Sequence, residues 1–125
     1  MSKFKDKLRE KIEGWRPRTT KLVKEYGDTK VGEVTIAQCI GGMRGVKCLT
    51  TDISYLDPLE GIRFRGYTIP ECLEKLPKPP GSEMPYVEGH FYLLLTGDIP
   101  GEEDIKEVER SIQKKKKERY QRGSG

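Results

Sequence analysis

Apolar residues recur at helical spacing near the start of the chain. The intervals are four, four and three positions, which predicts a helix over residues 3–14 with a single apolar stripe. The stripe consists of Phe4, Leu8, Ile12 and Trp15. Ser2 can cap this helix, and Gly14 and Pro17 are expected to end it. A second short helix is predicted over residues 19–27, with Gly27 as its C-cap.

The middle of the chain favours strands. β-favouring runs occupy residues 31–36, 46–54 and 61–66. Between the last two runs, residues 55–61 contain an Asp-Pro step and a glycine, which is typical of a turn. The runs predict a small antiparallel sheet. A sheet of this size is marginal alone and needs a helix or a partner against one face.

The last third of the chain returns to helical patterns. A helix is predicted over residues 68–77, with Thr68 as its cap and Pro70 in its first turn. After an exposed loop, the apolar stretch 86–97 predicts a buried helix that ends at Gly97. Residues 101–122 begin acidic and end basic, as the helix dipole favours. Their thin apolar stripe could face a neighbour and consists of Ile105, Val108 and Ile112. The predicted fold class is mainly α with a small antiparallel β-element near the N-terminus.

Composition limits what the chain can do by itself. The 125 residues are 34% apolar and 35% charged, which is polar for a self-sufficient domain. We therefore expect a fragment of a larger protein, or a subunit that is stabilised by a partner. The net charge of +4 is uneven, with basic residues gathered in 1–30 and 114–122. We interpret them as a solvated helix face and a tail, and we expect no nucleic-acid partner.

The three cysteines, Cys39, Cys48 and Cys72, form no C-x-x-C pair, and their odd number favours a reducing compartment. We expect them to be small buried or half-buried side chains without an activating neighbour. A single histidine excludes a His-rich metal site, and no metal site is predicted. The chain has no apolar run of membrane-spanning length, no secretory core and no acid-poor presequence. These features predict a soluble cytoplasmic protein.

The stretch CIGGMRGVKCL, residues 39–49, places three glycines around Arg44. A glycine turn and a guanidinium could bind phosphate, but the spacing matches neither common phosphate-loop motif. A structural bend between two strands is the simpler interpretation.

Evidence for a catalytic role is weaker for the histidine and the carboxylates. His90 lies two residues from Glu88, so the two side chains do not share a helix face, and a half-buried or surface histidine is favoured over an acid or base. Four carboxylates could pair, although their spacing does not say which lie close: Asp52, Asp57, Glu60 and Glu71. Asp57, which precedes Pro58, is explained as a turn-former. No catalytic residue is predicted.

Three segments taken together resemble the N-terminal part of the citrate synthase family, of the mitochondrial or eukaryote-like type. They are VGEVTIAQCIGGMRGVKCL, DISYLDPLEGIRFRGYTIPECLEKLP and FYLLLTGDIPGEED, in that order. The run L-D-P-x-E-G-I-R-F-R-G is the most specific part. The resemblance covers roughly residues 1–110. It implies the N-terminal segment of a large domain over 1–110, followed by a basic helical or frayed tail over 111–125, whose Gly-Ser-Gly end could be non-native.

The resemblance implies the condensation of acetyl-CoA with oxaloacetate to citrate and CoA, by a mainly helical homodimer. In the family an aspartate and two histidines perform the acid/base steps, and they lie beyond this segment. His90 matches none of them. The chain is therefore not expected to be active alone. The partner that the resemblance implies is a second copy, or a chain that carries the rest of the fold. The location would be cytoplasmic, or the mitochondrial matrix in a eukaryote.

One residue role is carried over from the resemblance. In the family, the arginine of the G-G-M-R-G turn contacts a phosphate of CoA, and that position is Arg44 here. No cofactor is expected to stay bound, since acetyl-CoA and CoA are substrate and product. The alternative function is a non-catalytic binding or assembly module derived from the same fold.

Overall fold

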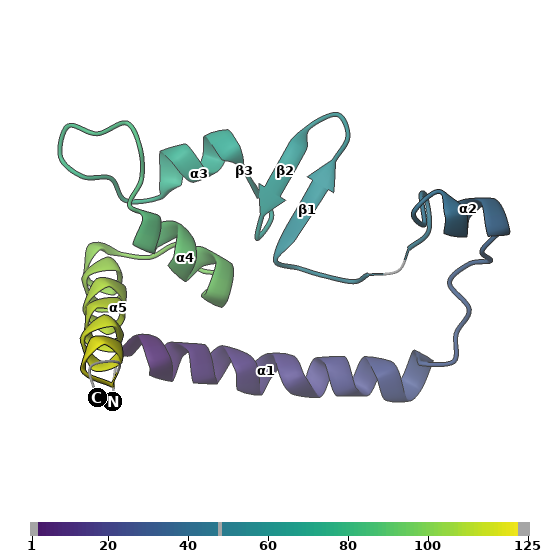
Figure 1. The fold of residues 1–125 in the computed structure, drawn as a ribbon, viewed down its shortest axis with the longest axis horizontal. Helices are drawn as coiled ribbons and strands as arrows, with labels where there is room; N and C mark the ends of the chain where they lie inside the picture. The colour runs from purple at the N-terminus through teal and green to yellow at the C-terminus, as the bar shows by residue number, and fades with distance from the viewer. Residues whose placement is uncertain (1–2, 48, 123–125) are drawn as a thin grey trace. The chain divides into compact units, whose positions relative to one another are not determined.

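The computed structural model describes residues 3–47 and 49–122, so the predictions for Ser2, Cys48 and the final Gly-Ser-Gly lie outside the described residues. The chain divides into two units. The first unit comprises Met1–Ile12 and Asp52–Gly125, and the second comprises Glu13–Thr51. The described part is mainly helical with one small antiparallel sheet, which confirms the predicted fold class (Figure 1).

Helix α1 is a single element that spans Lys3–Tyr26. The predicted break at Gly14 and Pro17 is therefore wrong. Pro17 has no N–H, so the hydrogen bond to the Glu13 carbonyl is missing. Because Pro17 and Glu13 are both exposed, water can hydrogen-bond to this carbonyl instead. Good helix formers on both sides continue the helix. The predicted apolar stripe is confirmed, since Phe4 is buried and its other three members are partly covered.

The sheet contains β1 (Ser54–Asp57), β2 (Gly61–Phe64) and β3 (Tyr67–Thr68), in that order and all antiparallel. The pair Asp57 and Gly61 closes the first hairpin. The predicted run 61–66 is confirmed as a strand over Gly61–Phe64, whereas Arg65 and Gly66 form the turn to β3. The run 46–54 contributes only Ser54 to a strand among its described residues, because the hairpin turn is shorter than the sequence suggested and places the first strand later.

Three helices follow the sheet as predicted: α3 (Ile69–Lys75), α4 (Val87–Thr96) and α5 (Glu102–Arg122). Thr68 caps α3, and its side chain accepts a hydrogen bond from the Glu71 N–H. Gly97 ends α4 with φ 78°, the left-handed conformation that glycine adopts without a steric cost. Helix α5 runs without interruption past residue 110, so the first part of the predicted tail is helical.

Two small apolar clusters form the core of the first unit. One joins Phe4, Tyr92 and Val108, and so holds α1, α4 and α5 together. The other joins Cys72, Leu76 and Leu93, with Phe64, Tyr67 and Ile99 packed against it. Leu93 is fully buried, which confirms α4 as the buried helix.

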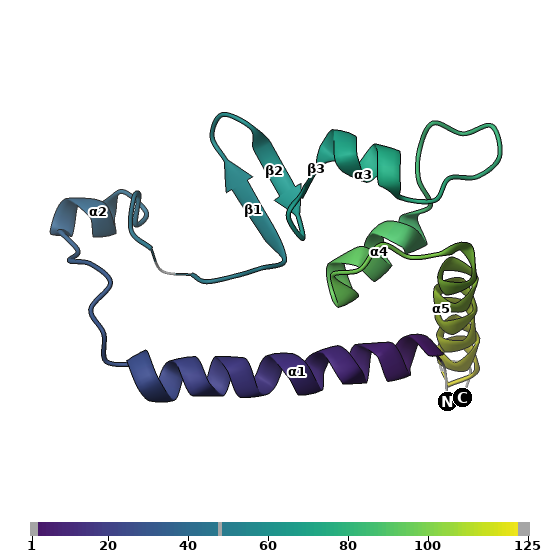
Figure 2. The same cartoon turned by 180° about the vertical axis from the view of Figure 1, so that it is seen from behind.

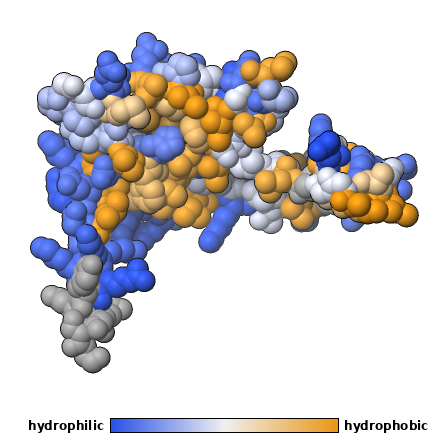
Figure 3. Space-filling view, turned by 45° about the horizontal axis from the view of Figure 1, so that its top comes forward, coloured by the Kyte–Doolittle hydropathy of each residue, from blue (hydrophilic) through white to orange (hydrophobic). Residues whose placement is uncertain are grey.

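Polar contacts fix the start of α1 on the rest of the first unit. The Phe4 N–H donates to the Glu107 carboxylate at 3.1 Å, and the Lys11 ammonium lies 2.8 Å from the Asp98 carboxylate. Figure 2 shows the first turns of α1 beside α5 from behind. Many large apolar side chains nevertheless remain exposed, and those on the face shown in Figure 3 are orange.

The second unit has little packing of its own. None of its described residues is buried. Apart from the end of α1, its one described helix is α2 (Ile36–Ile40). The strand predicted over 31–36 is wrong, because Thr35 and Gln38 form a capping box that starts a helix at Ile36. A β-favouring run forms a strand only where another strand pairs with it, because β propensity depends on that context.

Candidate anion-binding turn

The side chain of Gln38 organises the segment around Arg44. Its Oε1 accepts the Thr35 N–H at 3.0 Å, and its Nε2 donates to the Arg44 carbonyl at 3.4 Å. The same amide therefore ties the start of α2 to the turn that follows it. This connection is not visible in sequence, because the two bonds depend on how the chain folds back after α2.

The glycine turn reverses the chain directly after α2. The Met43 N–H donates to the Gln38 carbonyl at 2.7 Å, and the Val46 N–H donates to the Met43 carbonyl at 3.0 Å. Gly42 and Gly45 have φ values of 74° and 75°, where glycine is favoured. The predicted bend is confirmed, but it follows a helix and does not join two strands.

Arg44 projects from this turn with an exposed side chain, beside a shallow hollow lined also by Ala37, Gln38 and Gly41. The N–H groups of Met43 and Val46 are donated within the turn. The exposed guanidinium can offer an anion up to five N–H donors in a planar fork.

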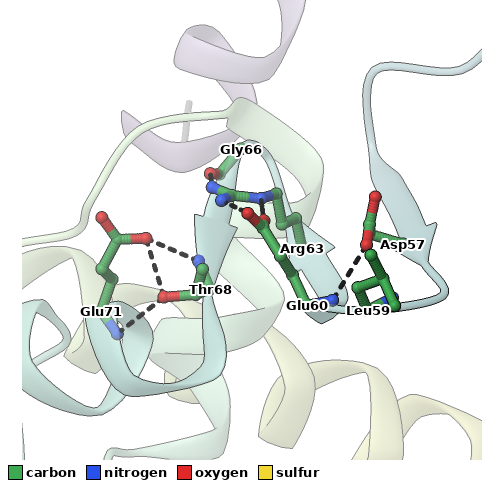
Figure 4. A network of polar contacts seen from close by, with 7 residues as sticks. All are labelled: Asp57, Leu59, Glu60, Arg63, Gly66, Thr68 and Glu71. Carbon is green, nitrogen blue, oxygen red and sulfur yellow. Dashed lines mark hydrogen bonds and ion pairs between the residues drawn. The ribbon is translucent and has the colours of Figure 1, made fainter.

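Three of the four carboxylates considered as catalytic pairs, Asp57, Glu60 and Glu71, bond to nearby backbone or side-chain donors (Figure 4). Asp57 accepts the N–H groups of Leu59 and Glu60 at 2.8 and 2.9 Å, which confirms it as a turn-former. These backbone hydrogen bonds, from Glu60 first and then Leu59, lower the pKa of Asp57. An anion held this way is not prepared to take up a proton near neutral pH.

Two further carboxylates in Figure 4 have structural partners. Glu60 accepts from the Arg63 Nε at 3.0 Å, and Arg63 also donates to the Gly66 carbonyl at 3.0 Å. Glu71 accepts the Thr68 N–H at 2.7 Å, and the hydrogen bonds from Thr68 lower the pKa of Glu71. The acidic residues therefore hold the hairpin and the start of α3.

Sequence reasoning missed Arg65, whose guanidinium is almost fully buried. Its side chain is 7% exposed, and its Nε donates to the Leu94 carbonyl at 2.9 Å. The guanidinium also forms an ion pair with the exposed side chain of Asp52, whose carboxylate lies 3.1 Å away. The specific R-F-R-G run was the available signal, but alternation along a strand does not say which arginine is buried.

His90 and the cysteines take structural positions. His90 is half-buried, as predicted. Its ring meets the Phe64 ring edge-on, with 4.6 Å between the two ring centroids. Cys72 is buried, and burial raises the pKa of its thiol. Cys39 is exposed, so the prediction that it is buried or half-buried is wrong, because none of the residues of the short helix α2 is buried. No three metal-binding side chains cluster in the described part of the chain.

A family model described as "Citrate synthase, C-terminal domain" matches residues 42–122 of this chain. The chain belongs to the citrate synthase family. The mitochondrial citrate synthase of Emericella nidulans is 50% identical over 105 residues, which cover 84% of this chain and 22% of that protein. The mitochondrial citrate synthase of Aspergillus niger is 52% identical over the same length.

Relatives from animals match equally broadly. The mitochondrial citrate synthase of Xiphias gladius is 47% identical over 112 residues, which cover 90% of this chain and 24% of that protein. The chain thus spans less than a quarter of the length of these citrate synthases. Among the described residues, no helix is long and apolar enough to cross a membrane.

Proposed function

We propose that the chain supplies the N-terminal part of a citrate synthase, which condenses acetyl-CoA with oxaloacetate to give citrate and CoA. The observation that carries this proposal is about 50% identity, across most of this chain, to proteins named citrate synthase. Because those proteins are named mitochondrial, we place this one in the mitochondrial matrix.

Citrate synthase activity needs catalytic residues in addition to those of this chain. The catalytic aspartate and histidines of the family resemblance have no counterpart in this chain, and acid/base catalysis needs several groups held together in one cavity. We therefore propose that these residues come from the remainder of the citrate synthase fold, and that the complete fold assembles with a second copy as a homodimer. The exposed apolar side chains favour such a partner, since monomers seldom leave so many uncovered.

Within this function Arg44 binds a phosphate of CoA. The support is its place on a glycine turn held by Gln38, and the exposure of its guanidinium. The fork can meet two phosphate oxygens at once, and the turn limits the positions that its backbone can take. CoA enters as the acyl carrier of the substrate and leaves as product.

Complementation tests the function. The chain alone should release no CoA from acetyl-CoA and oxaloacetate, whereas mixing it with a polypeptide that carries the remainder of a relative should restore release. Arg44→Ala in the complementing chain should raise the KM for acetyl-CoA about tenfold or more, as loss of a charged hydrogen bond predicts. The exposed neighbour Lys47→Ala is the matched control and should change KM little.

The phosphate assignment has its own readout. If Arg44 holds the ribose phosphate, acetyl-dephospho-CoA should show the same KM with and without the Arg44→Ala substitution. If it holds the pyrophosphate, the substitution should weaken both substrates. An Arg44→Ala variant with unchanged KM for both substrates would refute the assignment while leaving the complementation result intact.

A second candidate function is a non-catalytic assembly module derived from the same fold. The many exposed apolar side chains favour it as well, since they fit any apolar partner. A stable complex that forms but releases no CoA would support this candidate over the enzyme.

A further inference from the structure

A groove on the first unit lies between the first turn of α1, helix α4 and one face of α5. Its cavity volume is about 490 Å³, within the usual range for ligand sites. Figures 1 and 2 both show the start of α1 beside α5. The lining residues are Phe4, Lys5, Phe91, Val108, Ser111, Ile112, Lys114, Lys115 and Glu118.

One part of the groove is apolar. Phe4 and Val108 form its buried floor, and both belong to the core cluster with Tyr92. Phe91 and Ile112 are still 43% and 47% exposed, so they offer uncovered apolar surface. Val108 and Ile112 are four residues apart on α5, which places them on one helix face. The exposed apolar surface of Phe91 and Ile112 therefore adjoins the buried side chains of the core.

The remainder of the groove is basic. Lys5, Lys114 and Lys115 line it, against one acidic residue, Glu118. None of these three lysines forms an ion pair with a carboxylate among the described residues. Elsewhere on α5, Lys106 is paired with Glu103. The groove therefore combines an apolar base with ammonium groups that are available to a partner.

We propose that this groove docks an acidic amphipathic helix of a partner polypeptide. From Val108 to Glu118 the groove follows α5 for about 15 Å, which matches about ten residues of a second helix. Apolar anchors one helical turn apart would pack on Phe91 and Ile112. Carboxylates flanking those anchors would meet the lysines, and this charge complementarity selects an acidic partner over a basic one.

The groove does not suit a nucleic acid, because its lysines are not interleaved with several stacking aromatic side chains and its floor is apolar. The proposal uses no residue of the Arg44 turn, so it does not depend on the proposed function.

The test measures peptide binding to the full 125-residue chain. The probe is a fluorescent helical peptide of about 14 residues, with leucines at helical spacing on one face and glutamates elsewhere. A matched peptide keeps the leucines and replaces every glutamate by lysine. Fluorescence anisotropy should show binding of the acidic peptide, at least about tenfold weaker binding of the basic one, and weaker acidic binding at high salt.

Two charge-reversed variants locate the site. Lys114→Glu with Lys115→Glu should weaken binding of the acidic peptide about tenfold. Lys116→Glu with Lys117→Glu changes the same net charge on the same helix, but these residues do not line the groove, so binding should change less than about threefold. Ile112→Glu should also abolish binding, and circular dichroism checks that α5 stays folded.

Several outcomes would overturn the proposal. One is equal loss of affinity in the two double variants, which would mean attraction to the basic helix as a whole. Another is binding of the basic peptide as tightly as the acidic one. A third is no peptide binding together with saturable, Ile112-dependent binding of sodium decanoate, which would assign the groove to a small anionic amphiphile. If Ile112→Glu does not fold, the paired lysine variants still decide.

Discussion

The Arg65 guanidinium lies 3.1 Å from the Asp52 carboxylate, in an ion pair whose two members differ greatly in exposure. The arginine side chain is 7% exposed and the aspartate side chain 77%. Arg65 also donates to the Leu94 carbonyl near the end of α4. The pair therefore attaches the segment before β1 and the β2–β3 connection to α4, and Arg65 is its essential member.

Substitution should affect the two partners unequally. Arg65→Met removes the donor to a covered carbonyl, so we expect the free energy of unfolding to fall by about 1–3 kcal/mol. Asp52→Asn should cost less than about 1 kcal/mol, because the Asp52 side chain is 77% exposed and water screens its attraction to Arg65. Urea unfolding followed by circular dichroism measures both. Equal losses would contradict the structural role assigned to Arg65.

The cap of α3 offers a second prediction. Thr68→Ala removes the hydroxyl that accepts the Glu71 N–H, and we expect a loss of about 1 kcal/mol in stability. Thr68→Ser keeps the hydroxyl and should lose much less. A Thr68→Ser variant as unstable as Thr68→Ala would show that the methyl group, and not the cap, is what matters.

Stability should fall in acid because two carboxylates have lowered pKa values. Hydrogen bonds lower the pKa of Asp57 and of Glu71 in the folded chain below their ordinary values of 3.8 and 4.5. The unfolded chain therefore binds more protons as the pH falls. The contribution of both groups is present above the unfolded pKa values and is lost as the pH drops through the folded ones.

The measurement is the urea midpoint between about pH 5 and pH 2. The midpoint should drop steadily toward acid, and Asp57→Asn with Glu71→Gln should make the slope shallower. Glu74→Gln removes one charge from an exposed position on the same helix and serves as the control. A slope that the double substitution leaves unchanged would assign the acid sensitivity to other groups.

The two described cysteines should react with a thiol reagent at very different rates. Cys39 is exposed, whereas Cys72 is 6% exposed and its thiol pKa is raised by burial and then by Glu71. In a Cys48→Ser background, an aromatic disulfide reagent should modify one thiol quickly and the second slowly until urea is added. Cys39→Ser should remove the fast phase. A surviving fast phase would mean that Cys72 becomes exposed readily.

Hydrogen exchange should separate the two units. No described residue of the second unit is buried, so amides between residues 27 and 47 should exchange within seconds at neutral pH. Amides of α4, which holds the fully buried Leu93, should be protected by orders of magnitude. Mass spectrometry of peptic fragments measures both. Comparable protection in the two segments would contradict the absence of a core in the second unit.

Local signals predicted several elements correctly. Thr68 and Glu71 stand three apart before an apolar run, which is enough for a capping box, and Gly97 follows the apolar helix α4 as its C-cap. Asp57 before Pro58 predicted the turn that the structure contains. Each of these features depends on bonds within a few residues, so neighbouring letters of the sequence specify it.

The candidate turn was predicted in part. The glycines around Arg44 indicated a bend, and the positive φ values of Gly42 and Gly45 agree. The role of Gln38 could not be predicted, because its bond to the Arg44 carbonyl requires the end of α2 to be known first. The identity of the family came from whole segments of sequence and needed no geometry.

By itself, the sequence determined the family, the caps of α3 and α4, the hairpin turn after Asp57 and the three C-terminal helices, since these rest on local bonds and on apolar spacing. Only the tertiary structure decided that α1 continues through Pro17, that residues 31–35 form no strand, and that Arg65 rather than Arg63 is the more deeply buried arginine. The burial of Arg65 depends on a distant group, the Leu94 carbonyl. The other two outcomes depend on which of two competing local signals wins, at Pro17 in α1 and at the Thr35–Gln38 capping box of α2. A propensity is a small local free energy, and packing or pairing with a distant element is large enough to override it.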